Sequence, residues 1–386
     1  MAKGKTLFTY KVIIPYTESS NPRKPFKIEY VVEAPDRDNA LQKAEREFFA
    51  YTGYNNAAWV RMPDRTGIRI WKLLPDLPQT AQTIDELVGM LVTEDQDVIY
   101  NTLKKLCDLE DSSAASRVQP FITNPNPDLA AIAIEGLGRM GDRAYLQPLM
   151  DLYPQQSDPR IKATILSSIS RLAKQNDELH DILAAALGDE DGRVRANAVE
   201  VIDHLRLASA AKLLVPLLSD EDNRVRANVL KALWATHDRE ALMKSLKAMM
   251  EDANRWMRAS AAFVLQHIDV EGRLELLCKL SRDPDTDVFR ASWRALLSLA
   301  GHECIPYWLD YLFRHQEEDL PQVMEKVETL GSDAAEPLLK MIARHDELSP
   351  LAQRFFDRLE DRAWEEEGWW SWLQLKKKRF FSPPKT

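Results

Sequence analysis

Two stretches of this 386-residue chain carry almost the same sequence. Residues 189–202 read DEDGRVRANAVEVI and residues 220–233 read DEDNRVRANVLKAL, an offset of 31 residues. Each copy is an acidic turn, then Val-Arg-Ala-Asn, then an apolar helical face. Repetition with a period of about 20–50 residues is typical of solenoids, in which each unit stacks only on its neighbours. The sequence therefore predicts an α-solenoid.

The apolar residue before the arginine serves as an anchor for finding further copies. Nine anchors follow, at Val98, Leu129, Ile161, Val194, Val225, Met257, Phe289, Leu320 and Leu351. Neighbouring anchors lie 31 to 33 residues apart, and each period holds two helix-length apolar runs and two turns. We therefore expect about nine helical hairpins.

An aspartate precedes the repeated arginine by six residues in three copies: Asp189 before Arg195, Asp220 before Arg226 and Asp252 before Arg258. Such a residue can accept hydrogen bonds from N–H groups at a helix start. It can also pair with the arginine of a neighbouring unit. We interpret the series mainly as a structural ladder between repeats, with a charged binding stripe as the alternative.

The unit resembles a HEAT repeat, and more narrowly the HEAT-like repeats of the phycobilisome lyase (PBS lyase) group. The matching residues are Asp189, Val194, Arg195, Ala198 and Ile202 with their equivalents one and two repeats on, EGLGRMG at 135–141, and the first-helix prolines Pro148, Pro216 and Pro337. The resemblance covers roughly residues 80–360. It implies a mainly α, right-handed solenoid whose second helices line a concave groove.

Composition limits the partners and the compartment. Residues 1–78 have a net charge of +4, residues 79–375 of −18 and residues 376–386 of +5. An array this acidic repels nucleic acid, so no nucleic-acid partner is expected. The N-terminus lacks a signal-peptide pattern, and the cysteines are three and unclustered. We expect a cytoplasmic protein.

The first 78 residues predict a small α+β domain. Residues 6–16 and 26–34 have strand patterns, a helix is expected from about Asp36 to before Gly53, and 57–62 and 67–74 add one or two strands. The β-β-α-β order is similar to that of a small phycobilisome linker domain; a generic domain packing on the solenoid end is the alternative. A double-stranded-RNA-binding fold competes less well, because no leading helix and no basic helix start are evident. We expect it to fold alone, to be drawn to the acidic array by charge, and to supply a second partner contact.

No motif of catalysis or metal binding stands out. The seven histidines form no HExxH, and there is no CxxC, phosphate-binding glycine loop or G-x-S-x-G elbow. No catalytic, metal or cofactor-binding residue is predicted, and no cofactor. An enzymatic role stays open but is not favoured; phycobilin lyase is the activity that the resemblance would imply.

Helical geometry then selects the surface of the second helices as the candidate site. Residues three, six, nine and ten after an anchor are expected to face outwards. The predicted groove residues are Asn197, Glu200, Asn228, Lys231, Trp234, Phe263, Gln266 and His267. Trp234 and Phe263 are the expected partner anchors, unless both lie tucked between helices.

The C-terminal stretch, residues 361–386, is rich in tryptophan and then in lysine. It either covers the open end of the last repeat or docks on a membrane or partner. The docking candidates are Trp369, Trp370, Trp372, Lys376, Lys377 and Lys378. The expected domains are therefore 1–78, the repeat array at 79–360, and this cap or tail.

Three functions follow from these features. The first is a non-catalytic scaffold, adaptor or assembly factor that holds another protein in the groove; the resemblance extends it to phycobilisome or photosynthetic complex biogenesis. The second is a bilin lyase, or a lyase-like chaperone of phycobiliproteins. The third is a peripheral membrane adaptor that uses the tail.

Overall fold

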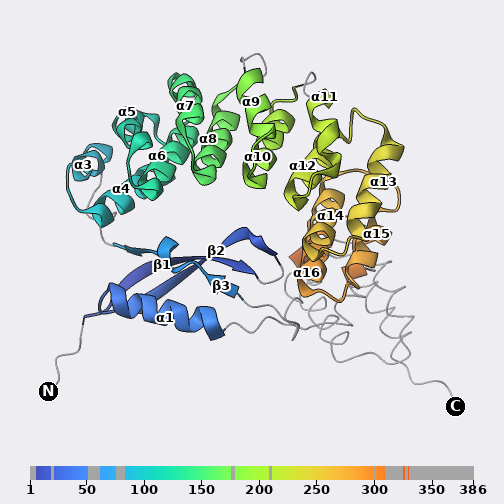
Figure 1. Ribbon diagram of the computed structural model, residues 1–386, viewed down its shortest axis with the longest axis horizontal. Helices are drawn as coiled ribbons and strands as arrows, with labels where there is room; N and C mark the ends of the chain where they lie inside the picture. Colours follow the sequence, from blue (N-terminus) through green and yellow to red (C-terminus); the bar gives the residue numbers. More distant parts are fainter. Residues whose placement is uncertain are drawn as a thin grey trace, which may run out of the picture. The chain divides into compact units, whose positions relative to one another are not determined.

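The computed structural model describes residues 6–18, 21–50, 61–74, 83–174, 179–207, 211–299, 301–305, 307–308, 325–326 and 329. It is a mainly helical array of HEAT-type hairpins, preceded by a small domain of one sheet and one helix (Figure 1). The chain forms two compact units, residues 1–233 and 234–386.

The N-terminal domain has the predicted order of elements. Its sheet has the order β2-β1-β3, and β4 also pairs with β1; all three pairings are antiparallel. From Tyr10 to Tyr16, every second side chain of β1 points toward α1 and joins a core that includes Phe48. These side chains are Tyr10, Val12, Ile14 and Tyr16. The elements are β1 (Phe8–Glu18), β2 (Asn21–Ala34), α1 (Arg37–Ala50), β3 (Arg61–Pro63), η1 (Arg65–Gly67) and β4 (Arg69–Lys72).

Each repeat in the described residues pairs a first helix with a longer second helix, called here the B helix. The first helices are α3 (Ile84–Met90), α5 with η3 (Ala115–Val118, Gln119–Thr123), α7 (Leu146–Leu152), α9 (His180–Leu187), α11 with η7 (Ala211–Leu214, Val215–Ser219), α13 (Arg239–Met250) and α15 (Arg273–Leu280). The B helices are α4 (Gln96–Leu109), α6 (Pro127–Met140), α8 (Pro159–Leu172), α10 (Gly192–His204), α12 (Asn223–Leu233), α14 (Arg255–His267) and α16 (Thr286–Ser298). Short 3-10 turns are η2 (Ser112–Ala114), η4 (Arg143–Tyr145), η5 (Tyr153–Gln155) and η8 (His302–Cys304).

Each of these seven B helices starts in the same way. The side chain of an aspartate or asparagine N-cap accepts the N–H two residues on, which satisfies one of the donors left open at a helix start. The N-caps are Asp95, Asn126, Asp158, Asp191, Asp222, Asn254 and Asp285. The anchor lies three residues after each N-cap and is buried in six of these seven helices; Val98 is half-buried.

One predicted anchor is wrong by one residue. Phe289 is half-buried, whereas Val288 is fully buried and lies three residues after the Asp285 N-cap. The sequence comparison was misled because Phe289 occupies the position of the repeated arginine. The two remaining anchors, Leu320 and Leu351, lie outside the described residues.

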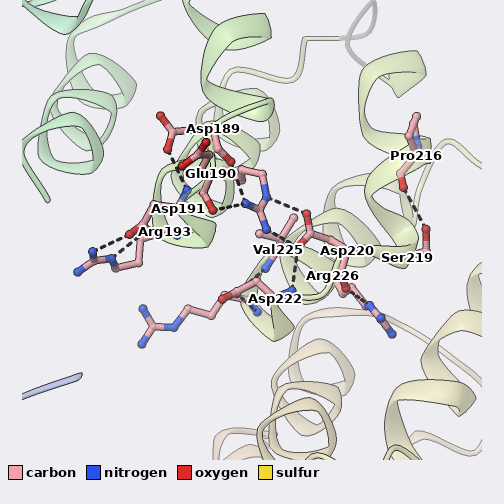
Figure 2. A network of polar contacts seen from close by, with 12 residues as sticks. Asp189, Glu190, Asp191, Arg193, Pro216, Ser219, Asp220, Asp222, Val225 and Arg226 are labelled. Atoms are coloured by element: carbon pink, nitrogen blue, oxygen red, sulfur yellow. Dashed lines mark hydrogen bonds and ion pairs between the residues drawn. The ribbon is translucent and has the colours of Figure 1, made fainter. Parts of the chain in front are cut away.

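The predicted ladder is confirmed between Arg195 and Asp220. Arg195 donates from Nε and Nη2 to the two carboxylate oxygens of Asp220, at 2.8 and 2.7 Å. It also donates from Nη1 to the carbonyls of Asp189 and Glu190 in its own repeat. In Figure 2 the turn of Asp220 and Asp222 lies beside the turn of Asp189 and Asp191. Arg195 therefore ties two repeats together. Arg226 contacts the carbonyl of Asp220 in its own repeat.

The ladder has further rungs. Lys162 holds Asp189 at 2.8 Å in the first unit, and Arg258 makes the bidentate contact with Asp283 in the second. The acceptor aspartates also fold their own turns, because Asp189 and Asp220 each accept the N–H of the N-cap two residues on. The capping itself belongs to that N-cap and not to the ladder aspartate.

The N-terminal domain packs on the first two repeats through β4. The ring of Trp71 stacks on Tyr100 with centroids 4.3 Å apart, and its Nε1 donates to Asp128 at 3.0 Å. Asp128, 6 % exposed, also pairs with Arg69 at 3.1 Å and Arg160 at 2.5 Å.

The backbone of β4 is held as well. Asn101 donates to the carbonyl of Lys72 at 2.9 Å and accepts the N–H of Leu74 at 3.3 Å. Asp97 accepts the N–H of Lys72. The array thus binds donors and acceptors along one side of β4. Docking therefore rests on a buried aromatic stack and directed hydrogen bonds, in addition to the charge difference that the sequence predicts.

The ladder predicts a specific loss of stability. Asp220→Asn keeps an acceptor for the N–H of Asp222 but removes the charged partner of Arg195, which is itself nearly buried. We expect the free energy of unfolding in urea to fall by about 2 kcal/mol. Asp181→Asn, at a fully exposed aspartate of α9, is the control. Equal stability of the two variants would contradict a structural role for the ladder.

Docking of the N-terminal domain predicts a local opening. Trp71→Ala removes the stack and one hydrogen bond to Asp128, so amide exchange at residues 69–72 should quicken while the B helices of the later repeats keep their protection. Phe49→Ala, at an exposed aromatic residue of α1, is the control. Raising NaCl to about 1 M should leave the wild-type exchange nearly unchanged, because salt screens exposed charges more than buried ones. Release by salt alone would show that charge holds the domain.

Candidate partner-binding surface

The candidate surface is the outward side of the B helices. We locate its residues by counting from the N-cap of each helix, since that count gives the same face in every repeat. Asn197 and Asn228 lie six residues after their N-caps, and Glu200, Lys231 and Phe263 lie nine after. Residues 197–231 of this set belong to the first compact unit, and residues 234–267 belong to the second.

The two asparagines do not face outwards, and that prediction is wrong. Asn197 is half-buried and donates to the carbonyl of Ala163 at 2.8 Å. Asn228 is buried and donates to the carbonyl of Ala196. Each side chain reaches the preceding B helix, because close stacking of repeats leaves backbone carbonyls within reach of this position. Both asparagines therefore hydrogen-bond neighbouring B helices to each other.

Glu200 and Lys231 lie near solvent but are engaged within the fold. Glu200 is exposed and accepts from Asn228 Nδ2 at 2.9 Å. Lys231 is half-buried and pairs with Asp203 at 3.0 Å. This part of the surface is polar and internally hydrogen-bonded.

Trp234 is buried, at 6 % exposed, so the prediction that it faces outwards is wrong. Its Nε1 donates to the carbonyl of Asp269 at 3.0 Å, and Arg239 lies over its ring. The reason is local, because α12 ends at Leu233 and helical counting no longer applies one residue later. Trp234 is therefore packed inside the fold, which was the alternative to a partner contact.

Phe263 takes the exposed alternative. It is 37 % exposed on α14, and its ring centroid lies 4.3 Å from that of His267 one turn on. His267 Nδ1 donates to the carbonyl of Phe263 at 2.8 Å, which fixes the orientation of the imidazole beside the phenyl ring. Gln266 between them is half-buried. We call Phe263, Gln266 and His267 the α14 face.

The next B helix, α16, carries exposed basic side chains. Arg294 of α16 is exposed and lies nine residues after the Asp285 N-cap, the position that Phe263 has on α14. Arg290 lies one turn earlier and is also exposed. α14 and α16 pack against each other in the second unit. An aromatic side chain therefore has a guanidinium at the equivalent position of the neighbouring repeat.

Metal-binding clusters and thiols are two kinds of group with potential for chemistry. The described residues contain no cluster of three or more His, Cys, Asp or Glu side chains placed to hold a metal ion. Burial raises the pKa of the Cys107 thiol to about 12 and that of Cys304 to about 11, and nearby Glu135 and Glu303 add to these effects. Both thiols are protonated at neutral pH and are poor nucleophiles.

The predicted tail residues, Trp369, Trp370, Trp372, Lys376, Lys377 and Lys378, lie outside the described residues. Among the helices that the structure does describe, none is both long and apolar enough to cross a membrane.

Sequence reasoning missed the residues that receive the N-terminal domain, chiefly Tyr100, Asn101 and Asp128. A signal was present, since Asn101 lies six residues after the Asp95 N-cap, as Asn197 and Asn228 do after theirs. In the first repeat no B helix precedes this asparagine, and it binds β4 instead.

Comparison with known proteins identifies the repeat. A family model of HEAT repeats matches residues 83–170 and 179–244. No match was found among the curated proteins. Among solved structures, the complex of CpcE and CpcF of phycocyanin lyase from Nostoc sp. PCC7120 is similar, at 14 % identity and a TM-score of 0.43, over 68 % of this chain and 95 % of that one.

Two other solved structures are similar over most of their own length. YibA of Escherichia coli has 16 % identity and a TM-score of 0.41, over 69 % of this chain and 98 % of that one. Human deoxyhypusine hydroxylase has 21 % identity and a TM-score of 0.28, over 55 % and 82 %. Scores this low transfer no activity. From its capped hairpins and the family match, this chain is a HEAT-repeat protein with a small sheet-and-helix domain at its N-terminal end.

Proposed function

We propose that this chain is a non-catalytic scaffold, adaptor or assembly factor that holds a protein partner against the α14 face. The exposure of Phe263 carries the proposal. The other predicted contacts nearby either bury their side chains or hydrogen-bond within the fold, as Trp234 and Asn228 do. A large aromatic side chain at the surface is the residue type that contributes most to binding energy in protein interfaces.

The surroundings of Phe263 limit the chemistry of the partner. Its aromatic ring and that of His267 provide an apolar, planar contact, and Arg290 and Arg294 on α16 supply positive charge in an otherwise acidic array. We infer a partner segment with an apolar side chain over Phe263 and a carboxylate directed at Arg294. The same features support a protein segment better than nucleic acid, whose phosphates the net charge of the array repels.

The other two hypotheses keep their basis in the sequence. The bilin-lyase hypothesis depends on the resemblance of the repeats, and the membrane hypothesis depends on the C-terminal residues beyond the described part. Neither gains a contact or a distance from the described residues. A role in photosynthetic complex biogenesis likewise remains a prediction from the resemblance.

A pair of variants with equal exposure tests the proposal. A photo-crosslinking amino acid replaces Phe263 in one full-length protein and Val215 in the other, since both side chains are 37 % exposed. Irradiation in extract of the source organism should crosslink one protein through position 263 and not through position 215. That protein, once purified, is then titrated with the wild type by calorimetry.

We expect Phe263→Ala to raise the Kd at least about tenfold, because truncating an interface anchor typically costs more than 1 kcal/mol. Arg294→Glu should weaken binding and Val215→Ala should not. The melting temperatures of all variants should match the wild type, since none of the three side chains is buried. Unchanged affinity of Phe263→Ala would remove the α14 face as the binding site.

A further inference from the structure

The outer edge of β2 is open in the part of the chain that the structure describes. β1 takes β2 on one side and β3 and β4 on the other, and no described strand lies beyond β2. β2 has 14 residues, against roughly 5–6 for an ordinary strand. Asn101 of the array hydrogen-bonds the backbone along one side of β4. Among the described residues, no hydrogen bond joins the array to the backbone of β2. A long open edge is a template for pairing with another chain.

The sheet register shows which backbone groups point to that edge. The N–H groups of Leu73 and Asp64 donate to the carbonyls of Thr9 and Pro15. The backbone N–H and C=O groups of odd-numbered β1 residues therefore point toward β3 and β4. The backbone groups of even-numbered β1 residues therefore point toward β2. There they face even-numbered residues, as Val12 faces Tyr30.

It follows that the backbone N–H and C=O groups of odd-numbered β2 residues point away from β1. The carbonyl of Glu33 agrees with this, because it accepts from Lys43 Nζ of α1 and not from β1. The open edge thus presents the backbone groups of Lys27, Glu29 and Val31, and those of Glu33 once the Lys43 side chain turns away from its carbonyl. Their side chains share the sheet face opposite α1 and all are exposed, Val31 to 65 %.

Two prolines mark the ends of this edge, and its centre is a single residue. Pro25 and Pro35 have no N–H to donate, and the residue midway between them is Tyr30. Antiparallel pairing of two β2 strands about Tyr30 places Lys27 opposite Glu33 and Glu29 opposite Val31, and the symmetry makes each pair occur twice. Opposite charges then face each other, and no like charges do.

Neighbouring registers are worse. Pairing about Glu29 places that glutamate opposite itself, and pairing about Val31 places Glu29 opposite Glu33. Like charges directly opposite each other destabilise a strand pair. Glu29 keeps a neutralising partner in its own chain, since Lys11 holds it at 2.7 Å. Lys27, which contacts Glu29 at 3.1 Å from an exposed position, is able to turn toward Glu33 of a second copy.

We propose that the outer edge of β2 is a homodimer interface, in which two copies of this chain form one continuous sheet about Tyr30. This surface lies in the N-terminal domain and does not depend on the α14 face. A second copy of this chain is the partner, because the charges on the edge of β2 are complementary to those of another β2. This holds in the register about Tyr30, which lies midway between Pro25 and Pro35.

A charge swap on the full-length chain tests both the interface and its register. Sedimentation equilibrium should show a concentration-dependent dimer for the wild type. Lys27→Glu sets two pairs of like charges against each other and should weaken the dimer at least about tenfold. The double variant Lys27→Glu, Glu33→Lys restores opposite charges and should recover the wild-type dimer to within about threefold. A double variant as weak as the single one would overturn the register.

A second pair of variants tests the backbone edge. Val31→Pro removes a donor that points away from β1, so the intramolecular sheet should persist while the dimer is lost. Val31→Thr keeps the donor and the strand preference and should dimerise as the wild type does. Circular dichroism and the melting temperature verify that each variant is folded. A wild type that stays monomeric up to about 200 μM, or a Val31→Pro protein that still dimerises, would overturn the proposal.

Discussion

The array depends on one repeated electrostatic arrangement at the start of the B helices. An aspartate such as Asp220 folds its own turn, and the residue two positions on caps the helix. The same aspartate receives a bidentate contact from Arg195 of the preceding repeat, which also binds carbonyls of its own turn. Capping, turn geometry and the spacing between repeats are therefore set by neighbouring atoms, so a change at one of these residues acts on all three.

A second repeated position shows how the two parts of the first unit fit together. Asn197 and Asn228 use their amides to bind a carbonyl of the B helix before them. The first repeat has no such helix, and Asn101 binds the backbone of β4 in its place. β4 therefore takes, at Asn101, the place that a preceding B helix has at Asn197 and Asn228. Trp71 and Asp128 add an aromatic stack and a buried charge contact to this junction.

These structural roles explain why the candidate surface is small. Most polar side chains that helical counting directs outwards are engaged in hydrogen bonds between helices or in ion pairs, as Asn228 and Lys231 are. What remains is an exposed aromatic side chain, Phe263, with His267 beside it and arginines on the next helix. The proposed scaffold role depends on this surface, because its described side chains provide contact area and charge.

The sequence by itself determined the repeat, its period, the Asp–Arg ladder and the order of strands and helix in the N-terminal domain. These features are local or recur at a fixed offset, so the residues of one repeat imply those of the next. Tertiary structure alone decided that Trp234 is buried beyond the end of α12, that Val288 and not Phe289 is the anchor, and that β4 docks on Tyr100 and Asp128. It also decided which side of β2 no described strand pairs with. Burial and docking depend on which surface a distant segment covers, and no local pattern records that.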